Sequence, residues 1–330
     1  MRRAGKTTGV AILKTGFLSK VNVDIEEMKS RFAPEPLDIF GTKEALAGEV
    51  GDLEVLIAMN QGFQRFTVDS DILAKAQKLR LVQHIGVATD ITDIDAAAAR
   101  GIPVATVPVQ NCRSVAETAM YLLLGCVKKG RTAQRLVDQG AMGEFVCSEL
   151  SGKTLCLMGL GTIGKMMVPM ARGFDMRVIG VRRDASKDGG AIEGVVKIFD
   201  PKDLHQALSQ SDVVVLALPL NAETANIIDT DALAAMNDDA FLVNLSRGGN
   251  VDRAALEAAL ASNRIAGFGT DVFWQEPNDP DEALLKDERV FATPHSGGKS
   301  IEAIRGDARE VHGNVMRLIK GEPLQNVANM

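Results

Sequence analysis

Thr154-Leu-Cys-Leu-Met-Gly-Leu-Gly-Thr-Ile-Gly164 is the stretch of sequence that decides the fold of this chain. An apolar run of strand length leads into Gly159, Gly161 and Gly164, and a segment with helical spacing follows directly at residues 165–174. In a strand, turn and helix of this kind, the first glycine makes a tight turn, the second lets the backbone approach a pyrophosphate, and the third lets the helix pack against the strand. The pyrophosphate would lie on the N–H groups of the helix N-terminus. The stretch therefore predicts a dinucleotide site, and an ordinary turn between a strand and a helix is the alternative.

The composition is that of an ordinary globular protein. The 330 residues suffice for two domains, with 46% hydrophobic and 24% charged residues. A net charge of -6 predicts no nucleic-acid partner, and no apolar run is long enough for a membrane span. The run at residues 10–13 is also too short for the core of a signal peptide. The cysteines lack the spacing of a metal site, so we expect no metal and a reducing, cytoplasmic setting: Cys112, Cys126, Cys147 and Cys156.

Apolar runs of strand length alternate with helical segments along the chain. Before the glycine turn, we expect strands at residues 10–13, 37–40, 55–59, 79–83 and 103–107, with helices at 42–47, 71–77 and 94–100. After it, we expect strands at 177–181, 213–216, 241–244, 265–269 and 290–292, with helices at 201–209 and 252–261. The two series predict an α/β protein of two doubly wound parallel-sheet domains with a ligand cleft between them. The final helical segment, 300–318, is free to return to the first domain.

Residues 115–129 predict a longer, strongly apolar helix. Such a helix must be covered, either by its own domain or by another subunit. The segment that follows it, 130–150, has only a weak pattern.

Two arginines follow the second strand of the glycine-turn domain. An NAD-specific site has an acidic residue here, which binds ribose hydroxyls of the adenosine half. This chain has Arg182 and Arg183 instead. Guanidinium groups pair with a 2′-phosphate, whereas a carboxylate repels it. The sequence therefore favours NADP(H), with NAD(H) as the second candidate; alternatively, both arginines are solvated surface residues.

Three segments near the ends of later strands each carry a charged or titratable group. They are Asn244-Leu-Ser-Arg247, Asp271-Val-Phe-Trp-Gln-Glu276 and Thr293-Pro-His295. Each segment alone is typical of a loop. Their combination behind a dinucleotide turn indicates the site of an enzyme.

Together these segments resemble the D-isomer-specific 2-hydroxyacid dehydrogenases, and the resemblance runs from about Leu79 to the end of the chain. Three segments before the glycine turn also resemble this family: His84-Ile-Gly-Val-Ala-Thr-Asp90, Arg100-Gly-Ile-Pro-Val-Ala and Asn111-Cys-Arg-Ser-Val-Ala-Glu117. The resemblance implies a Rossmann cofactor domain at 117–297, inserted into a flavodoxin-like substrate domain at 1–116 plus 298–330. It also implies a homodimer, because the apolar helix after Val115 resembles the family's dimer-forming helix.

The resemblance gives roles to four residues. His295 would be the general acid that protonates a carbonyl oxygen, and a carboxylate beside it, Glu276, would favour the charged imidazole. Arg247 would clamp the keto oxygen and the carboxylate of a substrate. Asp271 would hold the nicotinamide carboxamide.

Three other histidines compete with His295 for the role of the acid. His205 and His312 lie in polar helical segments, which is typical of surface residues. His84 immediately precedes the turn at Gly86 and stays the alternative acid.

The cofactor site is expected to gather residues from the ends of several strands. It comprises Gly159, Gly161, Thr162, Ile163, Gly164, Arg182, Arg183, Leu218, Pro219, Thr224, Leu245, Ser246, Asp271 and Gly297.

The family binds a substrate carboxylate with backbone N–H groups of a turn that matches Gly86, Val87 and Ala88. Its usual sequence, Gly-Val-Gly-Tyr, is Gly-Val-Ala-Thr here, so Ala88 restricts the backbone and Thr89 removes an aromatic ring. We therefore expect carboxylate binding without naming the substrate. Three aromatic residues either shape the pocket or serve packing: Phe63, Phe66 and Trp274.

The leading interpretation is an NADP(H)-preferring reductase of a small 2-oxo acid, such as glyoxylate or hydroxypyruvate, giving the D-2-hydroxy acid. A corepressor-like protein that senses a dinucleotide is the second interpretation, although a sensor has no need of an acid, its carboxylate partner and a clamp. The third is an enzyme of the same family with another substrate, such as phosphite or formate, because Leu218-Pro-Leu-Asn221 resembles a phosphite dehydrogenase.

Overall fold

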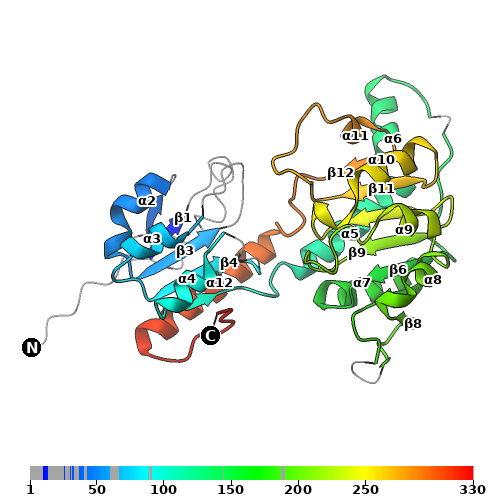
Figure 1. Ribbon diagram of the computed structural model, residues 1–330. Coiled ribbons are helices and arrows are strands. Elements are labelled where there is room, and N and C mark those ends of the chain that lie inside the picture. The colour runs from blue at the N-terminus through cyan, green and yellow to red at the C-terminus, as the bar shows by residue number, and fades with distance from the viewer. Residues whose placement is uncertain are drawn as a thin grey trace, which may run out of the picture. The chain divides into compact units, whose positions relative to one another are not determined.

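The computed structural model describes residues 10–13, 26, 30, 32, 37–40, 43–59, 67–87, 89, 91–143, 145–186 and 190–329. The chain divides into two compact units, one formed by Met1–Asn111 with Lys299–Met330 and the other by Cys112–Gly298. The second unit is therefore inserted into the first, as the colour of the ribbon shows (Figure 1). The division precedes helix α5 (Cys112–Val127), whereas a boundary at 116/117 would cut this helix.

The first unit contains a parallel sheet with the strand order β2-β1-β3-β4-β5. This is the order of the flavodoxin-like fold. The strands are β1 (Val10–Leu13), β2 (Leu37–Phe40), β3 (Val55–Met59), β4 (Leu81–Ile85) and β5 (Val104–Ala105). Its helices are α2 (Lys43–Glu49), the short η2 (Val50–Asp52), α3 (Ser70–Lys75), α4 (Ile94–Ala99) and α12 (Ile301–Lys320).

Helices cover both faces of this sheet. Leu56 and Val82 pack with residues of α2, α3 and α4 in one core cluster. Val55 and Leu81, their neighbours along the strands, pack instead with residues of α12. The final helix therefore does return to the first unit, and it completes the second layer of the core there.

Strand β4 lies two residues further along the chain than the predicted strand at 79–83. Its end was missed because the strand continues through polar residues, which an apolar pattern does not reveal. Gln83 and His84 are both fully buried at 0% exposure. Each side chain has a bonding partner in another segment: the amide of Asn314 in α12 donates to Gln83 over 2.8 Å, and His84 Nε2 lies 2.8 Å from the hydroxyl of Thr92. Buried polar groups are tolerated when they are bonded in this way.

The second unit contains a seven-stranded parallel sheet with the order β12-β11-β10-β9-β6-β7-β8. Counted from β6, this is the Rossmann order 3-2-1-4-5-6 with one further strand. The strands are β6 (Thr154–Met158), β7 (Arg177–Val181), β8 (Val195–Phe199), β9 (Val213–Leu216), β10 (Phe241–Asn244), β11 (Gly267–Thr270) and β12 (Val290–Ala292). The two doubly wound domains predicted from the sequence are thus confirmed.

This sheet is also covered on both faces. Along β6, Leu155 and Leu157 belong to the core cluster with α5 and α7 (Thr162–Gly173), whereas Cys156 and Met158 face the opposite cluster. The opposite layer is formed by η4 (Pro201–Asp203), α8 (Leu204–Leu208), α9 (Thr230–Ala235), η5 (Gly248–Asn250), α10 (Arg253–Ala261) and α11 (Ala283–Lys286). The apolar face of α5 is covered by its own unit, where Leu122 and Leu123 are fully buried.

Several elements were not predicted from the sequence, among them β8, α9 and α6 (Gly130–Asp138). Strand β8 lies at the edge of the sheet and buries only Phe199, so it has little apolar pattern. Helix α6 buries none of its residues, which explains the weak pattern at 130–150. Its neighbours in space, not in sequence, hold it in place.

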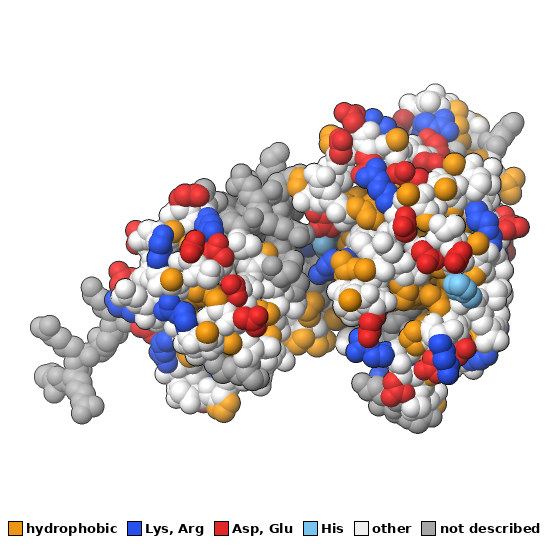
Figure 2. Space-filling view, in the orientation of Figure 1, with side chains coloured by type: hydrophobic (Ala, Val, Ile, Leu, Met, Phe, Trp, Pro, Cys, Tyr) orange, Lys and Arg blue, Asp and Glu red, His pale blue; other side chains and the backbone are white. Residues whose placement is uncertain are grey.

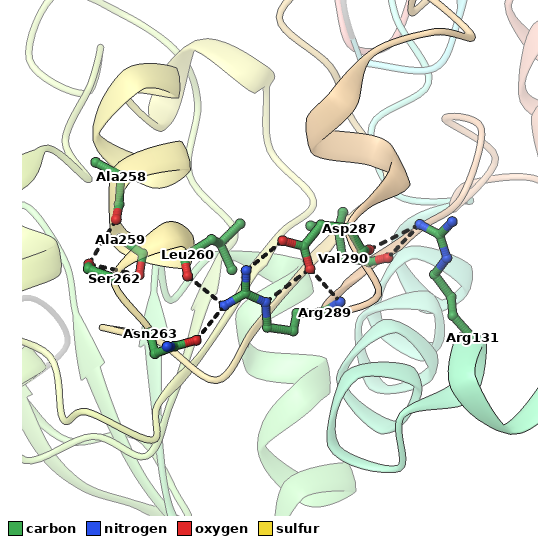
Figure 3. Close-up of polar contacts among 9 residues, drawn as sticks. All are labelled: Arg131, Ala258, Ala259, Leu260, Ser262, Asn263, Asp287, Arg289 and Val290. Atoms are coloured by element: carbon green, nitrogen blue, oxygen red, sulfur yellow. Dashed lines mark hydrogen bonds and ion pairs between the residues drawn. The ribbon is translucent and has the colours of Figure 1, made fainter.

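Arg131 at the start of α6 is one of these links. Its guanidinium donates to the carbonyl oxygens of Asp287 and Val290 over 3.2 Å each (Figure 3). It also donates to the carbonyl oxygen of Leu285. The same segment is tied to the end of α10 by Arg289, which pairs with Asp287 (Figure 3).

The face of the molecule in Figure 2 carries interspersed basic and acidic side chains, with no broad basic area. No helix in the described part of the chain combines the length and the apolar character needed to cross a membrane.

Candidate functional site

The glycine turn between β6 and α7 has the geometry of an anion site. Gly159 has a φ of 105°, and a Cβ atom there would collide with the carbonyl oxygen of Ala217. A Cβ atom at Gly164 would collide with the carbonyl oxygen of Gly159, so α7 packs directly on the turn. At Gly161, no described atom lies within 4 Å of an added Cβ atom. The backbone is therefore tight at the first and third glycines and open at the second.

The N-terminus of α7 adds N–H groups to this turn. Gly161 is the N-cap, and no side chain of the described residues caps the helix there. Thr162 is exposed and Ile163 is half-buried. The first N–H groups of a helix lack partners within it and carry partial positive charge. The open backbone at Gly161 and this uncapped helix end fit a pyrophosphate.

The two arginines after β7 differ in exposure. Arg182 is half-buried and donates a hydrogen bond of 3.2 Å to the carbonyl oxygen of Ala185. Arg183 is exposed, and its guanidinium lies 3.3 Å from the carboxylate of Glu223. Glu223 belongs to the turn after β9, so this ion pair joins two loops at the carboxyl edge of the sheet.

The loops after β9 and β10 are joined by the predicted cofactor residues. The backbone N–H of Leu218 donates to the hydroxyl of Ser246 over 2.9 Å. The hydroxyl of Thr224 donates to the carbonyl oxygen of Pro219 over 2.6 Å. Ser246 is buried and Leu245 is half-buried, so these two residues lie mostly beneath the surface of the loops.

Arg247 follows in an extended conformation, with φ −146° and ψ 150°. Its backbone is held on both sides, because Asn244 donates to its carbonyl oxygen over 2.8 Å and Asn250 accepts from its N–H over 3.1 Å. Its half-buried guanidinium donates to the carbonyl oxygen of Ser246 over 2.7 Å. Since a guanidinium has five N–H donors, it keeps others for a carboxylate or a keto oxygen.

Glu276 and His295 come from the loops after β11 and β12, and the structure brings them together. The Nδ1 atom of His295 lies 2.8 Å from Oε2 of Glu276, while Oε1 accepts from the N–H of Phe273 over 3.2 Å. With Nδ1 engaged, Nε2 is the ring nitrogen that remains for a substrate. His295 has a φ of 49°, a conformation that costs a non-glycine residue free energy and is found at functional sites.

Asp271 organises the loop that carries His295. Its Oδ1 accepts from the hydroxyl of Thr293 over 2.6 Å and from the N–H of Ser296 over 2.9 Å, and Oδ2 accepts from the N–H of Gly297 over 2.7 Å. Burial raises the pKa of the Asp271 carboxyl, and these three donors oppose the shift. The side chain to which the resemblance gives the nicotinamide carboxamide is therefore also bonded to the loop of His295.

Two residues that contact this loop were not identified from the sequence. Ser114 and Thr118, in α5, donate to the carbonyl oxygen of Gly297 over 2.7 and 3.2 Å. They lie 183 and 179 residues from Gly297 along the chain, so no local pattern could have identified them.

The turn at Gly86 belongs to the first unit. Gly86 has a φ of 93°, and its carbonyl oxygen accepts from the N–H of Val107 over 2.9 Å. Val87 is 54% exposed. Three residues of the predicted pocket lie outside the described residues: Phe63, Phe66 and Ala88.

The other histidines have different surroundings. His84 is fully buried beside Thr92, so it is not accessible to a substrate. His205 is exposed on α8. His312 lies on α12, where its ring packs edge-on against Phe32 at 5.1 Å.

Trp274 has a packing role in the described structure. Its indole N–H donates to the carbonyl oxygen of Val251 over 2.7 Å, and its ring lies 6.4 Å from that of Phe268 in the core.

The second unit thus places an anion-binding turn, a guanidinium and an imidazole–carboxylate pair at the carboxyl edge of one parallel sheet. Ligands of open α/β sheets bind at this edge, where the strand order reverses. The arrangement has the parts needed to bind a dinucleotide, to hold an anionic substrate and to transfer a proton.

Known proteins share this organisation. The family model described as the NAD-binding domain of the D-isomer-specific 2-hydroxyacid dehydrogenases matches residues 120–297. D-3-phosphoglycerate dehydrogenase of Methanocaldococcus jannaschii is 34% identical over 291 residues, which cover 88% of this chain and 54% of that protein. Glyoxylate reductase of Pyrococcus horikoshii is 34% identical over 289 residues, which cover 85% of this chain and 84% of that protein.

The chain spans about half the length of the phosphoglycerate dehydrogenases that it matches. Among solved structures, an acyclic imino acid reductase in complex with NADPH and D-Arg matches with a TM-score of 0.79 and 25% identity. That match covers 97% of this chain and 99% of the reductase.

Proposed function

Because the chain belongs to the family of D-isomer-specific 2-hydroxyacid dehydrogenases, we propose that it interconverts a small 2-oxo acid and its D-2-hydroxy acid with a nicotinamide dinucleotide. The observation that carries this proposal is the pair His295–Glu276, 2.8 Å apart at the sheet edge that also holds the glycine turn. A protein that only senses a dinucleotide has no need of this pair.

The residues divide the work of the reaction. The glycine turn and the N-terminus of α7 would hold the pyrophosphate of a nicotinamide dinucleotide, which would supply the hydride for C2 of the substrate. His295 gives a proton from Nε2 to the carbonyl oxygen, and it takes this proton back in the reverse direction. Glu276 stabilises the imidazolium through Nδ1. Arg247 pairs with the substrate carboxylate and keto oxygen and thereby orients C2.

The remaining predicted sites are part of the same proposal. The backbone of the turn at Gly86, Val87 and Ala88 binds the substrate carboxylate, and glyoxylate or hydroxypyruvate is the substrate to test first. The relative named glyoxylate reductase supports this choice. Asp271 has lone pairs beyond the three that it uses in the loop, so it also accepts from the nicotinamide carboxamide.

The cofactor is NADP(H) in preference to NAD(H). Arg182 and Arg183 stand where an NAD-specific site has a carboxylate, and the imino acid reductase that resembles this chain was solved with NADPH. Replacing Arg182 by Asp should raise the KM for NADPH well above that for NADH; an unchanged preference would refute the assignment.

The enzyme is proposed to be a cytoplasmic homodimer. Its four cysteines, all among the described residues, form no disulfide, as is usual in a reducing compartment. Large apolar side chains are exposed on one stretch that includes α6, and a second copy would cover them: Tyr121 at 56%, Val137 at 70%, Met142 at 94% and Val146 at 84%. Sedimentation of the protein tests this, since a monomer at micromolar concentration would contradict it.

A panel of 2-oxo acids, assayed with NADPH and NADH in parallel, tests the activity and the cofactor together. It should include glyoxylate, hydroxypyruvate, pyruvate and 3-phosphohydroxypyruvate, with phosphite and formate assayed in the oxidative direction. His295→Ala should lower the turnover of the preferred substrate by roughly 10²–10⁴-fold while NADPH still binds. His205→Ala, an exposed histidine on α8, is the control that should leave turnover unchanged. Tight dinucleotide binding without any turnover would instead indicate a sensor.

A further inference from the structure

The ion pair between Arg183 and Glu223 lies beside the predicted dinucleotide site. Arg183 follows β7 and Glu223 lies in the turn after β9, and β6, which leads into the glycine turn, lies between these two strands in the sheet. All three strands are parallel, so their loops leave the same edge. The pair therefore joins the loops on the two sides of the glycine turn.

The turn that carries Glu223 is fixed by its own hydrogen bonds. The side chain of Asn221 accepts from the N–H groups of Glu223 over 2.9 Å and of Thr224 over 3.1 Å. Asn250 donates to the carbonyl oxygen of Thr224 over 3.0 Å and ties the turn to the loop after β10. The backbone of Glu223 is thus held in place, so its carboxylate stays near Arg183.

Both members of the pair remain available to a ligand. The side chain of Arg183 is 77% exposed and that of Glu223 is 73% exposed. An ion pair this exposed contributes little to stability, so a phosphate can displace the carboxylate at little cost. Arg182, by contrast, is half-buried and bonded to Ala185.

We propose that Glu223 is a specificity-determining residue that weakens the binding of NADP(H) relative to NAD(H). The inference rests on the proposed dinucleotide site. A 2′-phosphate bound to Arg183 would take the place of the Glu223 carboxylate and lie close to it, and the two anions repel each other. The 2′-hydroxyl of NAD(H) carries no charge and meets no such repulsion. Glu223 thereby reduces the preference of a site with two arginines for NADP(H) over NAD(H).

Electrostatics sets the size of this effect. Two unit charges about 4 Å apart in water interact by an energy equivalent to roughly a fivefold change in affinity. Because Glu223 is exposed, salt should screen the repulsion, and the effect should shrink as the ionic strength rises.

Calorimetric titration with NADPH and with NADH, at low and at high salt, tests the role of Glu223. Glu223→Gln keeps the size of the side chain and removes its charge. It should bind NADPH about three- to tenfold more tightly at low salt, with NADH affinity unchanged and a smaller gain at high salt. Adenosine 2′,5′-bisphosphate should gain affinity in the same variant and AMP should not, which places the effect at the adenosine end.

The matched control is Glu257→Gln. Glu257 forms a half-exposed pair of 2.9 Å with Arg253 inside α10, outside the predicted cofactor site, and its substitution changes the net charge equally. This control should leave both affinities unchanged.

Arg183→Ser separates the two ways in which the inference could fail. If Arg183→Ser weakens NADPH binding but Glu223→Gln does not strengthen it, the role of Glu223 is overturned while the use of NADP(H) stands. Weaker NADPH binding in Glu223→Gln would also overturn it, because the carboxylate would then serve to orient Arg183. If neither variant changes NADPH affinity, the proposed 2′-phosphate site is refuted together with the inference.

Discussion

The Nδ1 atom of His295 lies 2.8 Å from Oε2 of Glu276, although the two residues come from loops after different strands. The carboxylate can therefore hold the ring in one orientation. In the proposed reaction, Glu276 acts through His295 and not on the substrate itself, so its contribution should depend on the presence of the histidine.

Glu276→Gln should lower the turnover of 2-oxo acid reduction by roughly tenfold or more, a part of the ~10²–10⁴-fold effect of a general acid. The amide keeps the size of the side chain but loses the charge that favours the imidazolium. The affinity for NADPH, measured by titration, should not change. In the double variant with His295→Ala, the loss should not exceed that of His295→Ala alone, because groups that act as one unit are not additive. Additive losses would contradict a role through His295.

The glycine turn supports a second prediction, because its three glycines differ in their surroundings. Gly159→Ala and Gly164→Ala should each destabilise the protein by at least about 1–3 kcal/mol, since the new methyl group meets backbone atoms. Gly161→Ala should cost less than about 1 kcal/mol, because its Cβ atom meets only open space.

Dinucleotide binding should follow the opposite order. The methyl group of Gly161→Ala would project from the open backbone on which we place the pyrophosphate, so NADPH affinity should fall by about tenfold or more although the fold is intact. Thermal unfolding and NADPH titration of the same three variants check both parts. A Gly161→Ala protein with normal NADPH affinity would place the pyrophosphate elsewhere.

Much of the fold was predictable because its signals are local. The buried strands β6 and β9 are continuous apolar runs, and the three glycines of the turn lie together in one short segment that directly follows β6. Strand β8 and helix α6 were missed because they bury almost nothing, so their positions depend on contacts such as Arg131 with Asp287. His84 was left out of the predicted strand at 79–83 because it is polar, and the bond to Thr92 that accompanies its burial does not show in an apolar pattern.

The residues of the candidate site also divide into those that a local motif indicates and those that depend on contacts distant in sequence. Arg247, Glu276 and His295 lie in the loops that follow β10, β11 and β12, so a motif in the sequence could indicate them. Ser114 and Thr118 were not predictable, because their role is a contact with Gly297 across the unit.

The loop of His295 gives a third prediction, at Asp271. Asp271→Asn keeps the shape of the side chain but replaces one accepting oxygen by a donor, which then faces N–H groups. The variant should lose about 1–3 kcal/mol of stability and most of its turnover. Thr293→Val removes only the hydroxyl bond to Oδ1 and should cost about 1 kcal/mol.

Ser114→Ala distinguishes the anchoring of this loop from the binding of the nicotinamide. It removes the bond from the Ser114 hydroxyl to the carbonyl oxygen of Gly297 and leaves Asp271 intact. If loop position limits catalysis, Ser114→Ala should lower turnover with little change in NADPH affinity. Normal turnover in Ser114→Ala, with weak NADPH binding in Asp271→Asn, would indicate that Asp271 acts only on the cofactor.

A fourth prediction concerns pH and the ion pair of Asp287 with Arg289 (Figure 3). Arg289 donates to Oδ2 over 2.6 Å from Nη2 and to Oδ1 over 3.0 Å from Nε, and it also donates to Asn263 over 2.9 Å. The bonds from Arg289 to the Asp287 carboxylate hold the pKa of Asp287 below its ordinary value. A carboxyl with a lowered pKa in the folded state stabilises the protein above its unfolded pKa, and this stabilisation is lost as the pH falls through the folded value.

Asp287→Asn should therefore be less stable than the parent by roughly 1 kcal/mol at pH 7, a modest value because both side chains are partly exposed. The difference should persist to about pH 4 and narrow below it, where Asp287 of the parent takes up its proton. Urea midpoints measured from pH 7 to pH 3 check this. Asp281→Asn, in an exposed pair with Lys286 whose side chains are 58% and 86% exposed, should leave the midpoint unchanged at every pH. A difference between Asp287→Asn and the parent that stays constant down to pH 3 would show that the charge of Asp287 contributes nothing, and that only the shape of the side chain matters at this junction.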